Sequence, residues 1–174
     1  LKKIEPYLDM TEKLGILLSQ LINNPIKAIK IECFGLIEEL KPVSISFLKG
    51  LFHEVTDNRI NFINAMSIAE ERGISIKHSY SSEKISYSNL VMATITTSNG
   101  DFSIGGSVFS ENHPRIVNIM GYSIDFFPEG VMLFMRNKDV PGVIGKIGTL
   151  LGENKINIAS YILSRQIKNK SAYS

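Results

Sequence analysis

The sequence predicts an α+β protein, in which helices and an antiparallel sheet are followed by a partial βαβ unit. Three observations predict this class. Apolar residues recur at helical spacing early in the chain, as at Met10, Leu14 and Leu18. Two alternating stretches, residues 90–97 and 102–109, are joined by Asn99-Gly100, which is a strong hairpin signal. Later, an apolar stretch, a Pro-Gly pair, a helical pattern and a second alternating stretch follow one another.

The elements before residue 128 are set by apolar periodicity and by the Asn, Pro and Gly residues between them. In chain order we expect a helix over residues 6–21, a strand around 29–33, a helix over 43–55, a helix ending at Gly73, a strand over 74–80, the hairpin, and short strands over 115–120 and 122–126. Pro128-Glu129-Gly130 then interrupts the pattern, so we place a domain boundary there.

The C-terminal unit is expected to be a strand, a loop, a helix and a strand. Residues 131–135, VMLFM, read as a buried strand, and Pro141 suits a first helical turn because its missing N–H is not needed there. Apolar residues at positions 143, 147, 150 and 151 form one helical face, which we expect to lie against a sheet. Residues 156–162 alternate as a second strand, and the crossover should be right-handed.

Polar groups around this predicted helix form a candidate site for a zwitterionic amino acid. The helix N-terminus after Asp139 favours a carboxylate, while Asp139 can pair with an ammonium. Asn137 lies on the preceding loop, and Asn157, early in the second strand, can both donate and accept hydrogen bonds. In the alternative interpretation Asp139 only caps the helix and Asn157 only ends a turn. Spacing alone leaves both interpretations open.

Composition limits the other function classes. The 174 residues carry a net charge of +2, and their Lys and Arg residues are scattered, so we expect no nucleic-acid partner. Cys33 is the only cysteine, which excludes an internal disulfide, a thiolate zinc site or an iron–sulfur cluster held by this chain alone. No apolar run is long enough to span a membrane and no signal peptide is evident, so we expect no membrane partner and a cytoplasmic location. Because the chain opens on Leu1, we expect it to be part of a larger protein.

Longer segments carry a family resemblance. PYLDMTEKLGILLSQL (residues 6–21), INFINAMSIAEERGISI (60–76) and the stretch from HPRIVNIMGYSIDFF to GKIGTLLGENKINIAS (113–160) resemble the C-terminal regulatory part of long-type D-3-phosphoglycerate dehydrogenases, the first enzymes of serine synthesis. The resemblance implies an ACT domain that binds L-serine at a dimer interface, and hence a homo-oligomer under feedback inhibition. Carried over by residue, the implied effector site comprises Asn137, Asp139, Pro141, Gly142 and Asn157.

The resemblance also implies a domain division. Residues 1–24 would be a helix from the end of the catalytic body, residues 25–128 the intervening domain, and residues 129–174 an ACT domain of βαββαβ type whose third strand, second helix and fourth strand are absent. Some relatives hold a phosphorylated effector in the intervening domain. Arg115 is the one possible anion contact here, because Tyr122 and Phe127 stand where those relatives place arginines. The NAD site and the catalytic residues would lie in the preceding part of the parent oxidoreductase.

No catalytic residue is expected in this chain. Gly105 and Gly106 lie inside a predicted hairpin strand and so fail the context test for a dinucleotide loop. The three histidines have no carboxylate or cysteine at catalytic or metal-ligand spacing, so we assign no metal or cofactor. Two alternatives to a dehydrogenase fragment remain open. One is the regulatory portion of a bacterial L-serine dehydratase, and the other is a non-catalytic interaction module.

Overall fold

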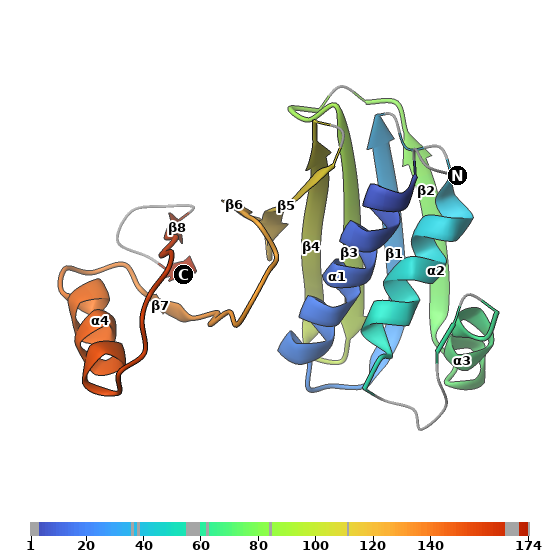
Figure 1. Ribbon diagram of the computed structural model, residues 1–174. Coiled ribbons are helices and arrows are strands. Elements are labelled where there is room, and N and C mark those ends of the chain that lie inside the picture. Colours follow the sequence, from blue (N-terminus) through green and yellow to red (C-terminus); the bar gives the residue numbers. More distant parts are fainter. Residues whose placement is uncertain are drawn as a thin grey trace.

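The computed structural model confirms the α+β class. It describes residues 4–35, 37, 39–54, 60–61, 63–83, 85–110, 112–165 and 171–173. Within these residues, four helices accompany a six-stranded sheet and a separate three-stranded sheet. Figure 1 shows the large sheet with its helices as one body and the small C-terminal unit beyond the β6 edge.

The large sheet has the strand order β2-β1-β3-β4-β5-β6. Its strands are β1 (Ile26–Gly35), β2 (Ser75–Ser81), β3 (Asn89–Thr97), β4 (Gly100–Phe109), β5 (His113–Ile119) and β6 (Tyr122–Phe126). Every neighbouring pair is antiparallel except β1 and β2, which are parallel. The expectation of a purely antiparallel sheet is therefore wrong at this edge. The reason is the connection, since α2 (Leu40–Leu51) and α3 (Ala65–Glu71) lie between the two strands in sequence and allow a parallel return.

The predicted hairpin is confirmed. Strands β3 and β4 pair from Val91 and Gly106 down to Thr97 and Gly100. Gly100 adopts φ +115°, a left-handed conformation that side chains other than glycine rarely take, and the Thr97 hydroxyl donates to the Gly100 carbonyl at 3.0 Å. The turn chemistry visible in the sequence is thus what joins the two strands.

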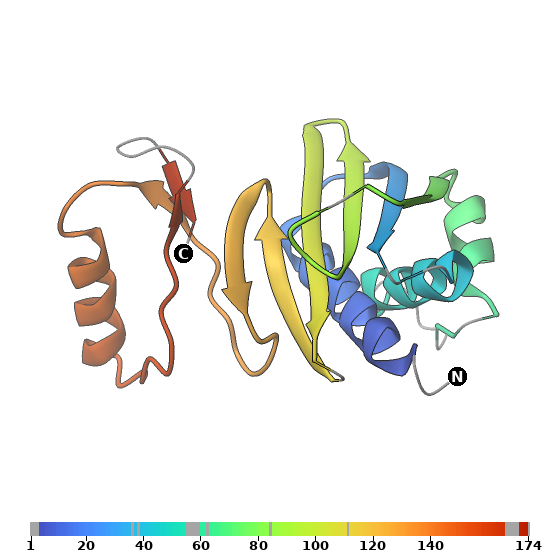
Figure 2. The ribbon, with the colours of Figure 1, turned by 90° about the horizontal axis from the view of Figure 1, so that it is seen from above.

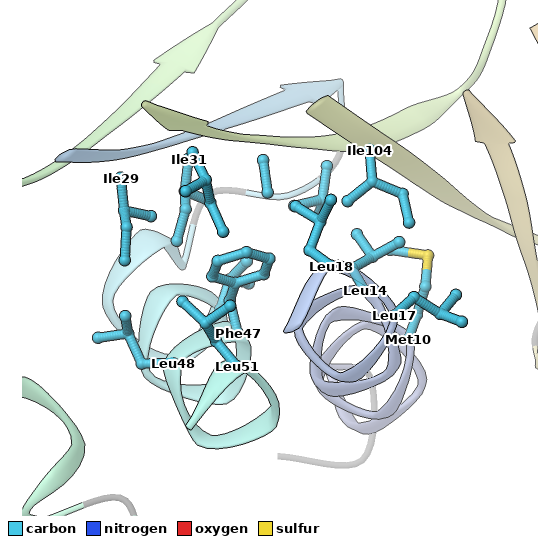
Figure 3. Packing of buried hydrophobic residues seen from close by; sticks show 14 of the residues in the cluster. Met10, Leu14, Leu17, Leu18, Ile29, Ile31, Phe47, Leu48, Leu51 and Ile104 are labelled. Atoms are coloured by element: carbon cyan, nitrogen blue, oxygen red, sulfur yellow. The ribbon is translucent and has the colours of Figure 1, made fainter. Parts of the chain in front are cut away.

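Helices α1 (Glu5–Leu21) and α2 lie side by side over one face of the sheet (Figure 2). Their apolar sides and the facing strand residues form the core, and the largest fully buried side chains include Met10, Leu14, Leu18, Ile31 and Phe47 (Figure 3). The predicted helix over residues 43–55 is confirmed as α2, which ends earlier, at Leu51; Val55 lies outside the described residues.

Two glycines allow α1 and α2 to approach each other closely. A Cβ on Gly15 would overlap the Phe47 carbonyl oxygen, and a Cβ on Gly50 would overlap the Glu12 carbonyl oxygen. An ion pair also joins the two helices at the edge of this contact, where the Lys49 ammonium lies 2.7 Å from the Glu12 carboxylate. Only glycine permits this separation of the two backbones.

The position of α1 differs from the expected domain division. We expected residues 1–24 to belong to a neighbouring catalytic body, yet α1 supplies Met10, Leu14 and Leu18 to the same core as the sheet. Its apolar stripe is therefore covered by the domain that follows it. A boundary after residue 24 would separate elements that share one core.

The strands predicted in the C-terminal unit are displaced. Residues 131–135 and 156–162 are not strands in the structure. β7 (Arg136–Lys138) begins after the first stretch and β8 (Ser164–Arg165) after the second, and both pair antiparallel with β9 (Ser171–Tyr173) in the order β7-β9-β8. The two outer strands are consequently parallel to each other, as expected, with a third strand between them. That third strand was expected to be absent.

The predicted helix of this unit is confirmed as α4 (Val143–Glu153), with two differences. It begins after Gly142, which is the N-cap residue at φ +92°, so Pro141 precedes the helix and does not lie in its first turn. None of its side chains is buried, and Leu150 is 60% exposed. The expected packing of an apolar face against a sheet is thus missing, because residues 131–135 and 156–162 do not form the strands that would provide that sheet.

A hydrogen bond and apolar contacts join the C-terminal unit to the large sheet. The Ser164 hydroxyl in β8 donates a hydrogen bond to the Ser123 carbonyl of the edge strand β6. Between the two sheets, the ring of Phe134 lies 5.8 Å from the ring of Phe126. Helix α4 lies on the far side of this unit from the large sheet (Figures 1 and 2).

Candidate functional site

Asp139 lies in the loop between β7 and α4, and its carboxylate faces a cation. The Arg165 guanidinium of β8 donates from Nη1 to Asp139 Oδ2 at 3.0 Å. The side chain of Asp139 is 13% exposed, whereas that of Arg165 is 51% exposed. Because β9 separates β7 from β8 in the sheet, this ion pair reaches across the unit. Asp139 therefore occupies a position that holds a positive charge, here the chain's own arginine; its pairing with a ligand's ammonium stays a prediction.

The start of α4 adjoins this carboxylate in the chain. Gly142 is the N-cap residue, and the Lys146 N–H donates to its carbonyl at 3.0 Å. No side chain makes a capping hydrogen bond at this N-cap. Asp139, three residues earlier, is not the N-cap residue, so the interpretation of Asp139 as the cap itself is not supported. Backbone N–H groups and the positive end of the helix dipole thus follow directly after Asp139.

Asn137 lies in β7, where it is paired with Ala172 of β9. Its side-chain amide donates to the Lys138 carbonyl at 3.0 Å. The side chain is half-buried and lies two residues from Asp139 in the chain. It therefore lies close in the chain to the loop that holds Asp139.

Asn157 is not brought to this loop within one chain. It is exposed and follows the C-terminal end of α4, whereas Asp139 precedes the N-terminal end. An 11-residue helix is about 16 Å long, so the two candidate residues are attached at opposite ends of it. Asn137 at the end of β7 and Asp139, Pro141 and Gly142 in the following loop thus lie in one segment, and Asn157 lies apart from it.

An open apolar groove of about 400 Å³ lies where Asn157 is found. Segments 131–135 and 156–162 form its two sides, and Phe126 of β6 and Ile147 of α4 contribute to it. Several side chains beside it are exposed, with Leu133 at 60% and Ile158 at 40%. These are the two stretches that the sequence predicts as strands. In the structure they have no strand partner, and the groove lies between them.

The Arg115 side chain, the possible anion contact, is already paired with a carboxylate. Its Nε donates to Asp125 Oδ1 at 2.6 Å, which pairs it with a carboxylate on the neighbouring strand. Tyr122 is buried at 8% exposure, and the Phe127 ring carries the Lys13 ammonium 5.4 Å from its centroid. An anion at Arg115 would have to compete with Asp125, so the geometry gives the expected contact no support.

The two glycines that were tested as a dinucleotide loop also have a structural role. Gly105 and Gly106 lie within β4, as expected. Among the described residues, no cluster of three or more His, Cys, Asp or Glu side chains could hold a metal ion. In the same part of the chain, no helix is both long and apolar enough to cross a membrane.

Sequence reasoning missed Arg165. It belongs to the polar segment that follows the second predicted strand, and its partner Asp139 is 26 residues away in sequence. A single basic residue in a polar stretch gives no signal of its own. Only the order of β7, β9 and β8 brings the two charges together.

Comparison with known proteins identifies the class of this fold. Residues 3–120 match the family model of the D-3-phosphoglycerate dehydrogenase intervening domain, a range that includes α1. The chain belongs to this family.

Full-length relatives extend the match over the rest of the chain. The D-3-phosphoglycerate dehydrogenase of Bacillus subtilis is 34% identical over 98% of this chain, and that of Archaeoglobus fulgidus is 35% identical over 92%. The enzyme of Mycobacterium tuberculosis is 30% identical over 98%. These alignments cover 33%, 31% and 33% of the relatives, so the chain spans about a third of their length and matches their C-terminal part.

Proposed function

We propose that this chain is the regulatory part of a D-3-phosphoglycerate dehydrogenase, and that residues 129–174 sense L-serine and impose feedback inhibition. The single observation that carries the proposal is the Asp139 loop. A carboxylate that is 13% exposed and holds a cation lies directly before a helix N-terminus. An α-amino acid carries the complementary pair of charges, an ammonium for Asp139 and a carboxylate for the helix N-terminus.

The strand arrangement supports an ACT-type unit. Two parallel strands, β7 and β8, flank an antiparallel third strand, and α4 connects the outer two in sequence. This is the split βαβ arrangement of ferredoxin-like domains, to which the βαββαβ order of an ACT domain corresponds. The groove beside residues 131–135 and 156–162 is where such a sheet would continue.

The separation of Asp139 and Asn157 supports a site shared between two copies of the chain. One copy would supply the Asp139 loop with Asn137, Pro141 and Gly142, and the other would supply Asn157. A ligand held in this way favours one relative orientation of the two subunits, and that preference can be transmitted to a catalytic domain. The proposed assembly is thus a cytoplasmic homo-oligomer in the serine-biosynthetic pathway.

Catalysis is assigned to the rest of the parent enzyme. The relatives are named as dehydrogenases, and we place the NAD site and the reacting groups in the part of the enzyme that this chain does not match. The cofactor would supply hydride transfer there. All relatives reported above are dehydrogenases, so the dehydratase alternative gains no support from them.

The test uses the full-length enzyme that contains this chain. Asp139→Ala should weaken inhibition by L-serine about tenfold to a hundredfold, since a charge-assisted hydrogen bond contributes about 1.5–3 kcal/mol. Asn157→Ala should act in the same direction with a smaller effect. The measurement is the serine concentration that halves the initial rate.

Asp125→Ala is the matched control, because Asp125 also pairs with an arginine but lies on the edge strand β6. It should leave serine inhibition as in the parent enzyme. If Asp139→Ala behaves like Asp125→Ala, the Asp139 loop is not the serine site.

A further inference from the structure

The Asp139–Arg165 ion pair is unequal in its exposure to water. Asp139 is 13% exposed and Arg165 is 51% exposed. A carboxylate that is mostly removed from water is costly to leave without a positive partner, whereas a half-exposed guanidinium can return to water at little cost. Asp139 therefore requires a cation, and Arg165 is the partner that can leave.

The backbone that carries Arg165 is fixed on two sides. Arg165 pairs with Ala172 of β9, and the neighbouring Ser164 is hydrogen-bonded to Ser123 of β6. Exchange at Asp139 thus needs only a rotation of the long arginine side chain, with no movement of β8. Such a rotation is inexpensive for a side chain whose head group is half in solvent.

We infer that Arg165 occupies the ammonium position of the amino-acid site when no ligand is bound, and that the ligand's ammonium must displace it. This inference rests on the proposed serine site and adds an internal competitor to it. Exchange leaves Asp139 paired with a cation throughout, while the released guanidinium turns toward water. The ligand's carboxylate is held at the N-terminus of α4 and is not required to bind Arg165.

Competition between Arg165 and the ligand's ammonium for Asp139 lowers the apparent affinity for the ligand. The apparent affinity of a ligand that binds only the displaced state is the intrinsic affinity multiplied by the fraction of molecules in that state. Removing the arginine should therefore tighten binding, which is the opposite of what is expected for a ligand-binding or structural residue. The sign of the effect is the decisive observation.

The experiment measures L-serine binding by calorimetry, together with serine inhibition, in the full-length enzyme carrying Arg165→Met. We expect binding about two- to fivefold tighter, in line with the strength of an exposed ion pair. Arg165→Gln should behave in the same way, whereas Arg165→Lys, which keeps a competing cation, should stay near the parent value. N-acetylserine, which lacks the ammonium, should not displace Arg165 and should bind none of these proteins.

Arg115→Met is the matched control, because it removes an arginine from the comparable pair with Asp125 and should leave serine affinity unchanged. Unchanged or weaker binding in both Arg165→Met and Arg165→Gln overturns the competitor role while leaving the serine site standing. Weaker binding would instead make Arg165 a partner of the ligand's carboxylate. If the parent enzyme itself binds no serine, the proposed function fails and this inference fails with it.

Discussion

Cys33 illustrates how the core determines the chemistry of a single residue. It lies in β1 with no exposed surface, between apolar neighbours of the sheet and the two helices. Burial raises the pKa of its thiol to about 12 from an ordinary 9.0, because the thiolate would lose its hydration. Cys33 is therefore a small residue of the core.

We expect the Cys33 thiol to resist modification in the folded protein. At a given pH its thiolate population should be on the order of a thousandfold lower than in the unfolded chain. The check is the rate of reaction with a chromogenic disulfide at pH 8, with and without denaturant. Rapid modification of the folded protein would contradict the burial described here.

The same residue predicts a pH dependence of stability. Between pH 9 and 12 the unfolded chain loses the thiol proton while the folded protein keeps it, so stability should fall as the pH rises through that window. Urea unfolding at pH 8 and pH 10 would show this. Cys33→Val removes the titrating group and is the control, because its loss of stability between the two pH values should be smaller.

At the scale of elements, the α1–α2 contact depends on two glycines. Gly15→Ala places a methyl group against the backbone of α2, and neither helix can yield without disturbing the core beneath it. We expect a loss of about 1–3 kcal/mol in the free energy of unfolding, against a gain of about 0.5–1 kcal/mol in helix propensity. Denaturant unfolding followed by circular dichroism measures the difference.

Gly148→Ala in α4 is the matched control. Apart from the adjoining backbone of α4 itself, no described atom lies within 4 Å of the Cβ that it would add, so the substitution changes helix propensity without creating a clash. It should leave the protein as stable as before or slightly more stable. Equal losses for Gly15→Ala and Gly148→Ala would show that the helix contact is not as close as described.

Elements were predictable where the signal is local. The hairpin at Asn99-Gly100 and the helices α1, α2 and α4 follow from turn chemistry and periodicity, and the structure confirms them. Residues 131–135 and 156–162 carry the right apolar pattern but are not strands, since a strand also needs a partner and β9 pairs only with residues 136–138 and 164–165. The parallel β1–β2 pair and the Arg165–Asp139 contact depend on tertiary arrangement, which no local pattern encodes. Within the candidate site, Asp139 could be singled out from its position before a predicted helix. Its partner Arg165 could not be predicted from the sequence.

At the scale of the molecule, α1 decides which part of the chain can fold alone. It supplies Met10, Leu14, Leu17 and Leu18 to the common core. Full burial of each such side chain stabilises a protein by about 1.5–3 kcal/mol, and a domain has only about 5–15 kcal/mol of net stability. Losing all four would consume most or all of that margin.

We therefore expect residues 1–128 to fold as a unit and residues 25–174 to remain unfolded. Circular dichroism and the dispersion of amide resonances in NMR spectra would distinguish the two states. Cooperative unfolding of residues 25–174 would restore the division after residue 24 and assign α1 to the catalytic body.

The placement of α1 also bears on the order in which the protein can form during synthesis. Met10 and Leu14 pack against Gly106 in β4, where an added Cβ would lie 2.8 Å from the Met10 sulfur. More than ninety residues separate these partners in the chain, so α1 is synthesised well before the strand that covers it. Contacts of such long range slow folding and leave apolar surface uncovered meanwhile. Until β4 has been made, the apolar stripe of α1 is thus a segment to which a chaperone would bind.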